Sequence, residues 1–348
     1  MAIEGLGTES SPLLVHNYDE LKTACEITGD WSYVNKTRYV RLVEDIDWNE
    51  DSRTWEAITL GYASSNDVTF VVALDLYGHT IKNILLENEK NMFLGVYWND
   101  MLYSSIKSTK GSGKLLNIFS NGSYAVIGMW GSNGKFYSPT GEVIPIKNIS
   151  ISVNATSMKS AAFISCYFEN CALYYVNSAP SETFTNPSGV ITSRDYSPTK
   201  FKDYGSDIFK NCDIYLDIKN IDTSKMYRLF SSASSTDITM TDCRISGKLT
   251  STDYNGVISK DGFLLNKSRG YLRNCVVDIE AKVSASHYFF GCYNGHTGVI
   301  NGEKMKAADG TYMTTDGQRQ WDMTYAWENH IKDADWLNDH GFNVVPIG

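Results

Sequence analysis

A short pattern of apolar and polar positions recurs along this chain: apolar, any residue, Asn or Asp, apolar, any residue, apolar. The residue after the Asn is Ile in the early copies and Cys in the later ones. Successive Asn or Asp positions are separated by 34, 31, 22, 41, 31 and 32 residues, and they are Asn83, Asn117, Asn148, Asn170, Asn211, Asp242 and Asn274. A constant motif at irregular spacing of this size predicts a solenoid whose core is constant and whose loops vary.

Each copy of the pattern is flanked by sequence that favours strands. The residues after the Asn alternate between apolar and polar, as in 212–218 and 275–283, which predicts a strand with one buried face. Most copies also follow a second apolar stretch rich in aromatic residues, and these stretches are 92–95, 124–128, 162–165, 228–231, 262–265 and 288–291. We therefore expect at least two short strands in each repeat, joined by a tight corner.

The Asn or Asp of the pattern suits that corner. Both residue types tolerate the left-handed backbone region that a sharp bend between strands often needs. In a stack of repeats these side chains would lie about 4.8 Å apart, where amides can bond to one another along the stack. We therefore expect the seven Asn and Asp residues to form one structural ladder.

The repeat resembles that of the right-handed parallel β-helix in pectate-lyase-like proteins and phage tailspikes, which carry such Asn ladders. The resemblance covers roughly residues 60–300. It implies an all-β fold: a single-stranded right-handed parallel β-helix, or solenoid, with an N-terminal helical cap and a C-terminal cap of helix and turns. We expect residues 1–60 to form the N-terminal cap and first strands, 61–302 the β-helix, and 303–348 a C-terminal cap or docking segment.

The two ends of the chain carry a resemblance of their own, to β-helical phage and bacterial surface proteins. Three motifs fall in order: 7–15 (GTESSPLLV), 42–47 (LVEDID) and 77–84 (YGHTIKNI), the last with Tyr77 where such proteins have Gly. A helix beginning near Asn17 or Asp19 is predicted to cap the open end of the solenoid. The segment 321–344 is similar to the closing segment of the same proteins, with a short helix that ends near Gly341.

The cysteines predict packing rather than disulfides or a metal site. There are seven, an odd number, and no CxxC motif occurs. Four of them share one repeat position, which predicts a column of free buried thiols: Cys171, Cys212, Cys243 and Cys275. Zinc held by stacked thiolates is the alternative, but ligands in a line do not make a tetrahedron. No D-x-D-x-D-G calcium loop is present either, so we expect no metal and no cofactor.

Charge and hydropathy exclude two classes of partner. Forty acidic residues against 31 basic ones give a net charge of −9, which argues against nucleic-acid binding. No stretch approaches 18 consecutive apolar residues, so we expect no membrane insertion. The N-terminus from Met1 lacks a basic region followed by an apolar run, so no signal peptide is expected. This pattern fits a virion protein, which is made in the host cytoplasm and released by lysis.

Catalysis would need carboxylates on the outer face of the solenoid. The candidates are Glu169, Asp213 and Asp217. Glycoside hydrolysis needs two carboxyl groups about 5–10 Å apart, whereas Asp213 and Asp217 are about 13 Å apart along a strand. Acidic residues on an outward strand face usually serve solubility. We therefore assign no catalytic residue, and the alternative of a polysaccharide hydrolase or lyase stays open.

Carbohydrate binding is the activity that the composition favours more. Aromatic rings stack on sugars and also anchor protein interfaces. Candidates in or beside the variable loops are Tyr97, Trp98, Trp130, Tyr137 and Tyr293. The alternative is that these side chains pack beneath the loops.

Taken together, these features predict a bacteriophage virion structural protein: a β-helical fibre, spike or capsid-surface decoration that attaches to a host surface or glycan. The expected partners are other virion proteins, a host-surface glycan and further copies of this chain in a homotrimer. Two alternatives are a tailspike-type enzyme that degrades polysaccharide and a bacterial surface adhesin module.

Overall fold

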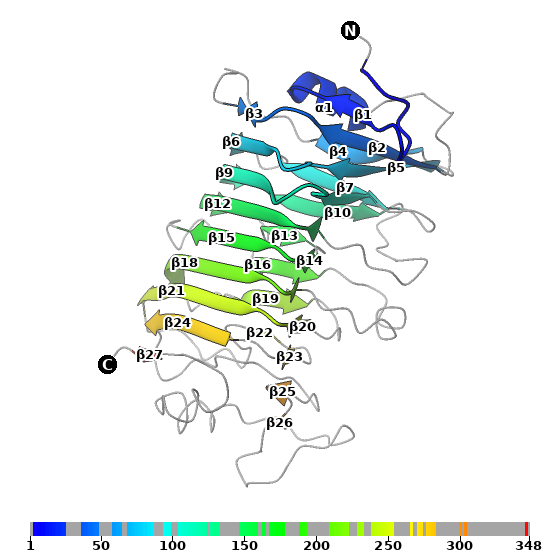
Figure 1. Cartoon of the computed structure of the whole chain (residues 1–348). Coiled ribbons are helices and arrows are strands. Elements are labelled where there is room, and N and C mark those ends of the chain that lie inside the picture. Colours follow the sequence, from blue (N-terminus) through cyan, green and yellow to red (C-terminus); the bar gives the residue numbers. More distant parts are fainter. Residues whose placement is uncertain are drawn as a thin grey trace.

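The computed structural model describes residues 3–25, 36–48, 58–64, 68–86, 93–98, 104–123, 126–131, 146–158, 162–164, 167–177, 188–193, 209–222, 228–232, 238–253, 265–266, 270–273, 276–282, 299–300, 303–304 and 345–346. Within these residues the chain forms a stack of parallel strands that climbs from one end of the molecule to the other (Figure 1). The predicted all-β parallel β-helix is therefore confirmed.

The longest strands form one sheet along the solenoid. Over the described residues it has nine strands, and neighbours in the stack are parallel. In order, the strands of this nine-stranded sheet are β3 (Ile46–Asp47), β6 (Thr80–Leu86), β9 (Gly113–Ser123), β12 (Ile149–Met158), β15 (Ala172–Asn177), β18 (Asp213–Asp222), β21 (Arg244–Asp253), β24 (Val276–Lys282) and β27 (Val345–Pro346).

Two further stacks complete the repeats. The upstream stack holds β4 (Ile58–Ser64), β7 (Leu94–Trp98), β10 (Ile127–Gly131), β13 (Phe163–Ile164), β16 (Ser188–Ser193), β19 (Arg228–Ser232) and β22 (Leu265–Asn266). The middle stack holds β1 (Leu13–Val15), β2 (Lys36–Leu42), β5 (Val68–Asp75), β8 (Ser105–Lys107), β11 (Ile146–Lys147), β14 (Phe168–Glu169), β17 (Phe209–Lys210), β20 (Ile238–Thr241), β23 (Gly270–Arg273) and β25 (Val299–Ile300). Antiparallel pairs join β4 to β5, and β25 to β26 (Glu303–Lys304).

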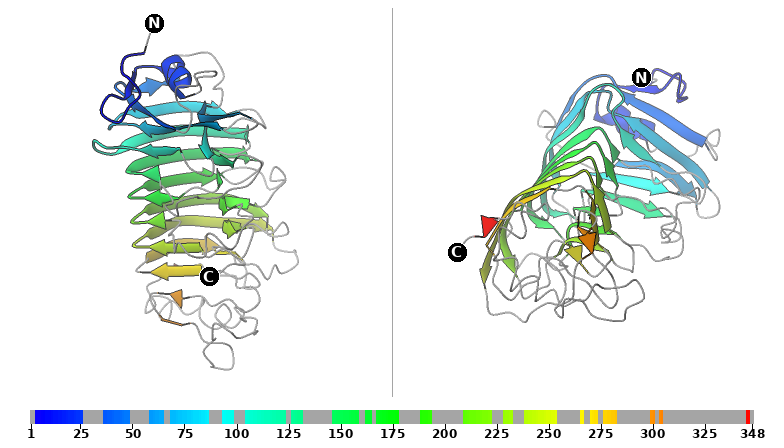
Figure 2. Two further views of the ribbon diagram at one scale, coloured as in Figure 1. Left: turned by 90° about the vertical axis from the view of Figure 1, so that its right-hand side faces the viewer. Right: turned by 60° about the horizontal axis from the view of Figure 1, so that its bottom comes forward.

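A regular repeat thus contributes three strands, one to each stack, where at least two were expected. The additional strand is the one in the middle stack, which can be as short as two residues, as in β14 and β17. Two residues are too few to show a period in the sequence, so this strand was read as part of the corner. In the right-hand view of Figure 2, the strands of each stack lie above one another and the stacks meet at a bend.

Helix α1 (Tyr18–Cys25) lies at the N-terminal end of the stack, where the predicted cap was expected. Asn17 caps it, since its Oδ1 accepts a hydrogen bond of 2.9 Å from the backbone N–H of Glu20. Leu21 is fully buried, and the rings of Tyr18 and Trp48 lie 4.4 Å apart between centroids. The helix therefore closes the end of the core. The C-terminal cap predicted over 321–344 lies outside the described residues.

The Asn and Asp residues of the repeat adopt left-handed backbone conformations, with φ between 51° and 64° at the described positions. They form two ladders, however, and not the single one expected. In the first ladder, Asn83 Nδ2 donates to Asp47 Oδ1 at 2.6 Å, and Asn117 Nδ2 donates to Asn83 Oδ1 at 3.1 Å.

The second ladder belongs to the later repeats. Asn170 Nδ2 donates to Asn148 Oδ1 at 3.3 Å, and Asn211 Nδ2 donates to Asn170 Oδ1 at 2.8 Å. Asp242 has the same left-handed conformation one repeat further on. Asn274, the last member expected, lies outside the described residues.

The two ladders occupy different places in the repeat. Asn117 lies within β9, where Leu116 and Asn117 together face the single residue Ser152 of β12, as in a β-bulge. Asn148 instead precedes β12, and its Nδ2 donates to the carbonyl of Ser108 at 3.0 Å. The separation of 31 residues between Asn117 and Asn148 resembles the other spacings, but these two residues do not occupy equivalent positions in successive repeats.

The inward positions of the nine-stranded sheet form continuous apolar columns. One column contains Ile151, Leu173, Ile214 and Ile245, which are register neighbours and at most 3% exposed. Burial of such a side chain contributes about 1.5–3 kcal/mol. Because every repeat adds to the same column, the core is continuous along the axis.

The cysteines of the repeat lie in this interior. Cys171, Cys212 and Cys243 are buried thiols outside any disulfide, and each directly precedes a strand of the nine-stranded sheet. The N–H of Asp213 donates to the carbonyl of Cys171, and that of Arg244 to the carbonyl of Cys212, so the three residues stack. The adjacent Cys212 thiol, together with burial, raises the pKa of Cys171 above its ordinary value. Cys275 lies outside the described residues.

The middle stack begins with β1 and β2, so the strand order runs without a break across residue 60 in the described ranges. This continuity does not by itself define a domain limit, so the proposed limits at residues 60 and 302 remain predictions. In the part of the chain that the structure describes, no helix is long and apolar enough to cross a membrane.

Candidate functional site

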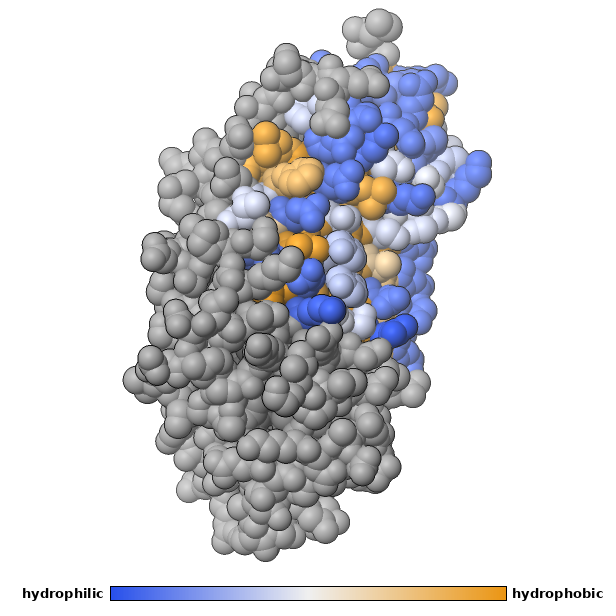
Figure 3. All heavy atoms as spheres, turned by 90° about the vertical axis from the view of Figure 1, so that its left-hand side faces the viewer, coloured by the Kyte–Doolittle hydropathy of each residue, from blue (hydrophilic) through white to orange (hydrophobic). Residues whose placement is uncertain are grey.

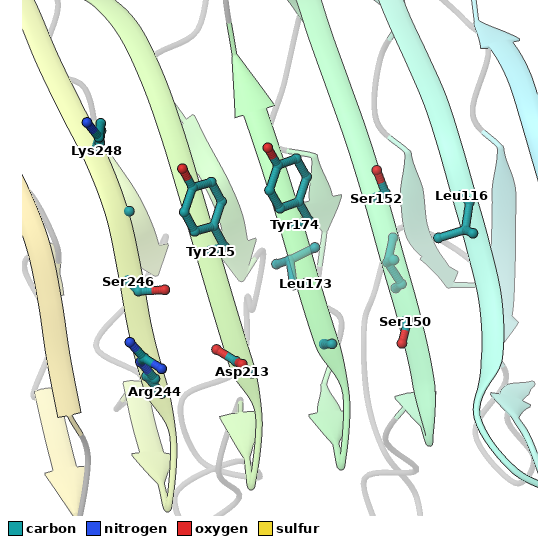
Figure 4. A pocket seen from close by; sticks show the side chains of 13 residues that line it. Leu116, Ser150, Ser152, Leu173, Tyr174, Asp213, Tyr215, Arg244, Ser246 and Lys248 are labelled. Carbon is teal, nitrogen blue, oxygen red and sulfur yellow. The ribbon is translucent and has the colours of Figure 1, made fainter.

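An open groove lies on the outward face of the nine-stranded sheet, with a volume of about 730 Å³. It crosses five neighbouring strands, from β9 to β21, and so runs along the axis of the solenoid (Figure 4). Its lining residues are Leu116, Ser150, Ile151, Ser152, Ala172, Leu173, Tyr174, Asp213, Tyr215, Arg244, Ser246, Gly247 and Lys248.

A pair of tyrosines stands in the middle of the groove. Tyr174 of β15 and Tyr215 of β18 are register partners, and both point outward because the inward positions alternate with theirs. Their ring centroids are 4.8 Å apart and their planes differ by 3°. Figure 4 shows the two rings side by side and turned the same way. Tyr174 is 45% exposed, so the pair forms an aromatic surface that a ligand can reach.

The residues next to the tyrosines in the same register are small. Ser152 is the partner of Tyr174 on β12, and Ser246 is the partner of Tyr215 on β21. Gly247 follows, and its φ of +130° is a conformation that other residues rarely adopt. A Cβ added there would lie 1.8 Å from the carbonyl oxygen of Leu216. The backbone therefore requires glycine at this position. Because Ser152 and Ser246 are small, the two tyrosine rings project further from the sheet than the side chains on either side of them.

Polar side chains border the aromatic pair. Asp213 and Arg244 are register partners, and Lys248 lies four residues beyond Arg244 on the same strand. Figure 4 shows Asp213 and Arg244 at one edge of the groove and Lys248 at the other. Together with the hydroxyls of Ser150 and Ser152, they offer hydrogen-bond donors and acceptors around an apolar centre. Such a mixture suits a ligand with hydroxyl groups and flat apolar faces.

The carboxylates considered as catalytic candidates lie on two different strands. Asp213 lines the groove, whereas Asp217 lies four residues further along β18, which is about 13 Å in a strand. Glu169 lies on β14 in the middle stack and forms an ion pair of 2.9 Å with Lys147. Hydrolysis of a glycoside would need two carboxyl groups about 5–5.5 Å or 6.5–9.5 Å apart. Asp213 and Asp217 are too far apart along the strand to form such a pair.

Three of the aromatic residues expected in or beside loops belong to strands of the upstream stack. Tyr97 and Trp98 belong to β7, and Trp130 belongs to β10. Tyr97 and Trp130 are register partners in the upstream stack. Trp98 is the last residue of β7 and Trp130 the next to last of β10, so both lie at strand ends, and their role in binding stays a prediction. Tyr137 and Tyr293 lie outside the described residues.

Tyr215 was not recognised from the sequence, although a signal was available. Tyr174 follows Asn170 by four positions, and Tyr215 follows Asn211 by four positions. Counting from the ladder residue therefore places both rings at the same point of the repeat. No group of three or more His, Cys, Asp or Glu residues within the described ranges is arranged to hold a metal ion.

Comparison with known proteins gives little guidance on function. No protein-family model matches the chain, and no curated protein matches it. One similar solved structure is the crystal structure of a putative immunoglobulin A1 protease from Bacteroides ovatus. It is 16% identical, the match covers 89% of this chain and 83% of that one, and the TM-score is 0.32. A score this low supports no argument about this protein.

Proposed function

We propose that this protein binds glycans through the groove between β9 and β21. The observation that carries the proposal is the exposed, parallel pair of Tyr174 and Tyr215 on a rigid sheet. Sugar rings have apolar faces that stack on aromatic rings, and their hydroxyls need donors and acceptors at the edges. Asp213 and Arg244 supply both kinds of group beside the rings.

The rigid sheet also favours binding energetically. Strand pairing on both sides holds the backbone that carries the rings, and the rings stack on each other, so little conformational freedom is lost when a ligand binds. The groove crosses five strands, which spans about 19 Å at the usual strand spacing. A chain of several sugars can therefore lie along the axis and contact successive repeats.

We further propose that the protein works in a bacteriophage virion, as a fibre, spike or surface decoration that attaches to the host. The support is the resemblance of the 7–15, 42–47 and 77–84 motifs to β-helical phage and surface proteins. Antibodies raised against the purified chain would label phage particles if this setting is right. The proposed homotrimer would have a native mass of three times 39.0 kDa by light scattering, and a monomer would contradict it.

Glycan binding can be tested with single substitutions in the aromatic pair. The wild-type chain would be screened on a glycan array, and the affinity for the best ligand measured by calorimetry. Tyr174→Ala and Tyr215→Ala should each weaken binding about tenfold, since loss of one stacked ring costs on the order of 1.4 kcal/mol. Tyr174→Phe keeps the ring and is the matched control. Unchanged affinity in both alanine variants would contradict the proposal.

A further inference from the structure

Exposed apolar side chains gather beside the groove. Among the described residues, the large hydrophobic side chains that are exposed are Leu6, Leu85, Phe119 and Tyr174. Three of these four lie on the outward face of the nine-stranded sheet. Leu85 of β6 and Phe119 of β9 are register partners and are 41% and 47% exposed.

This apolar pair continues the groove toward the N-terminal end of the solenoid. Leu116 lies three residues before Phe119 on β9 and lines the groove. The bulge at Leu116 and Asn117 places an extra residue in β9 opposite Ser152. Phe119 is two strands away from Tyr174 and two residues out of register with it, which is about 12 Å at the usual spacings. Leu116 therefore lies between the tyrosine pair and the apolar pair, and Ser152 of β12 separates it from Tyr174.

The size of the pair argues against a protein partner. Leu85 and Phe119 together expose an area on the order of 200 Å², whereas each partner in a stable protein interface buries about 800 Å². Lys82 lies three residues before Leu85, Lys114 lies five residues before Phe119 and Asn117 two before it, and all three are at least partly exposed. In the view of Figure 3, hydrophobic residues on the described surface lie in small patches bordered by hydrophilic ones. An area of this size suits a short hydrocarbon chain.

We infer that the ligand of the groove is a saccharide bearing an alkyl or acyl chain, which lies on Leu85 and Phe119 while a sugar ring stacks on the tyrosine pair. This inference rests on the proposed glycan binding. The chain belongs either to the lipid of a glycolipid or to a short acyl substituent on a polysaccharide. Both sources present the same chemistry to the protein, and the length of chain that improves binding distinguishes them.

A series of n-alkyl β-D-glucosides and β-D-galactosides, from methyl to octyl, tests the inference by calorimetry below the micelle concentration of each compound. Every methylene that the apolar pair covers should raise the affinity about twofold to fourfold. Octyl glycosides should therefore bind at least tenfold more tightly than methyl glycosides. A rise that ends at butyl indicates a short acyl substituent, and one that continues to octyl indicates a lipid chain.

Three variants assign the effect to its residues. Phe119→Thr and Leu85→Thr should reduce the ratio of octyl to methyl affinity to about threefold or less. Leu6→Thr is the matched control, because Leu6 is 72% exposed but lies in the N-terminal loop away from the groove. Thermal unfolding would verify that each variant is folded.

Two results would overturn the inference while leaving glycan binding intact: equal affinity along the series, or a Phe119→Thr variant that keeps the full ratio. A change in native mass on Phe119→Thr would also overturn it, because the apolar pair would then be a subunit contact. Failure of the proposed function looks different. In that case Tyr174→Ala would bind the methyl glycosides as the wild type does, or no glycoside would bind.

Discussion

Substitution of Asn170 tests whether the second ladder stabilises the solenoid. Asn170 has a φ of 54°, donates to Asn148 and accepts from Asn211. Alanine in this left-handed conformation costs about 1–2 kcal/mol. Loss of the two ladder bonds, which are solvent-exposed, adds about 0.5 kcal/mol each. Asn170→Ala should therefore lower the free energy of unfolding by about 2–3 kcal/mol.

A glycine variant separates the two contributions. Asn170→Gly keeps the left-handed conformation without strain but loses the same bonds, so it should destabilise by about 1 kcal/mol less than alanine. Asn154→Ala is the control, since Asn154 lies on β12 and is not among the residues with positive φ, and a surface change of this kind costs within about 0.5 kcal/mol. Urea unfolding followed by both circular dichroism and fluorescence gives the three values. Equal losses in the alanine and glycine variants would refute the backbone argument, and an alanine variant as stable as Asn154→Ala would refute the ladder.

Three other predictions follow from the interior and the cap. The buried thiols should resist alkylation by iodoacetamide in the native state and react in urea; they are Cys171, Cys212 and Cys243. Mass spectrometry of the peptides measures the labelling, and rapid labelling in the native state would contradict this prediction. Gly247→Ala should destabilise the protein by at least 2 kcal/mol in urea unfolding, because the added Cβ meets the Leu216 carbonyl and φ is positive. A hydrogen bond from the backbone N–H of His16 lowers the pKa of Glu20 from its ordinary 4.5. The ionised carboxylate of Glu20 therefore stabilises the folded protein above pH 4.5, and this contribution is lost as the pH falls below 4.5. The difference in stability between the wild type and Glu20→Gln should therefore shrink in acid, and a constant difference would contradict this.

The architecture could be predicted because successive repeats of a solenoid require similar residues at equivalent positions, so the repeat is visible in the sequence. Asn170, Asn211 and Asp242 each precede a strand at the same point of the repeat, and the alternation after them identifies the buried face. The ladder of the early repeats was misplaced for a physical reason. Asn83 and Asn117 satisfy the same local requirement for left-handed backbone, but at a bulge within the strand. A residue type that suits two kinds of bend cannot by itself tell which bend it makes.

The candidate site was harder to predict because it depends on register between strands distant in sequence. Tyr174 and Tyr215 are 41 residues apart, and neither belongs to a motif. Their contact follows from the pairing of β15 with β18, which places each residue opposite a partner. The predicted aromatic residues were chosen for their position near loops, whereas the groove lies on the flat face of the sheet.

The change of ladder also explains where the groove begins. From β12 to β21 the second ladder holds the corner at the same point of each repeat, so the register is regular across the outward positions and the two tyrosines meet. Between β9 and β12 the bulge at Asn117 inserts a residue, and the register shifts. Beyond that shift, the outward side chains of β6 and β9 include Leu85 and Phe119 together with Lys82, Lys114 and Asn117. We therefore expect a ligand that extends from the tyrosine pair past β9 to meet a surface of different chemistry, because the corners that set the register differ between the two regions.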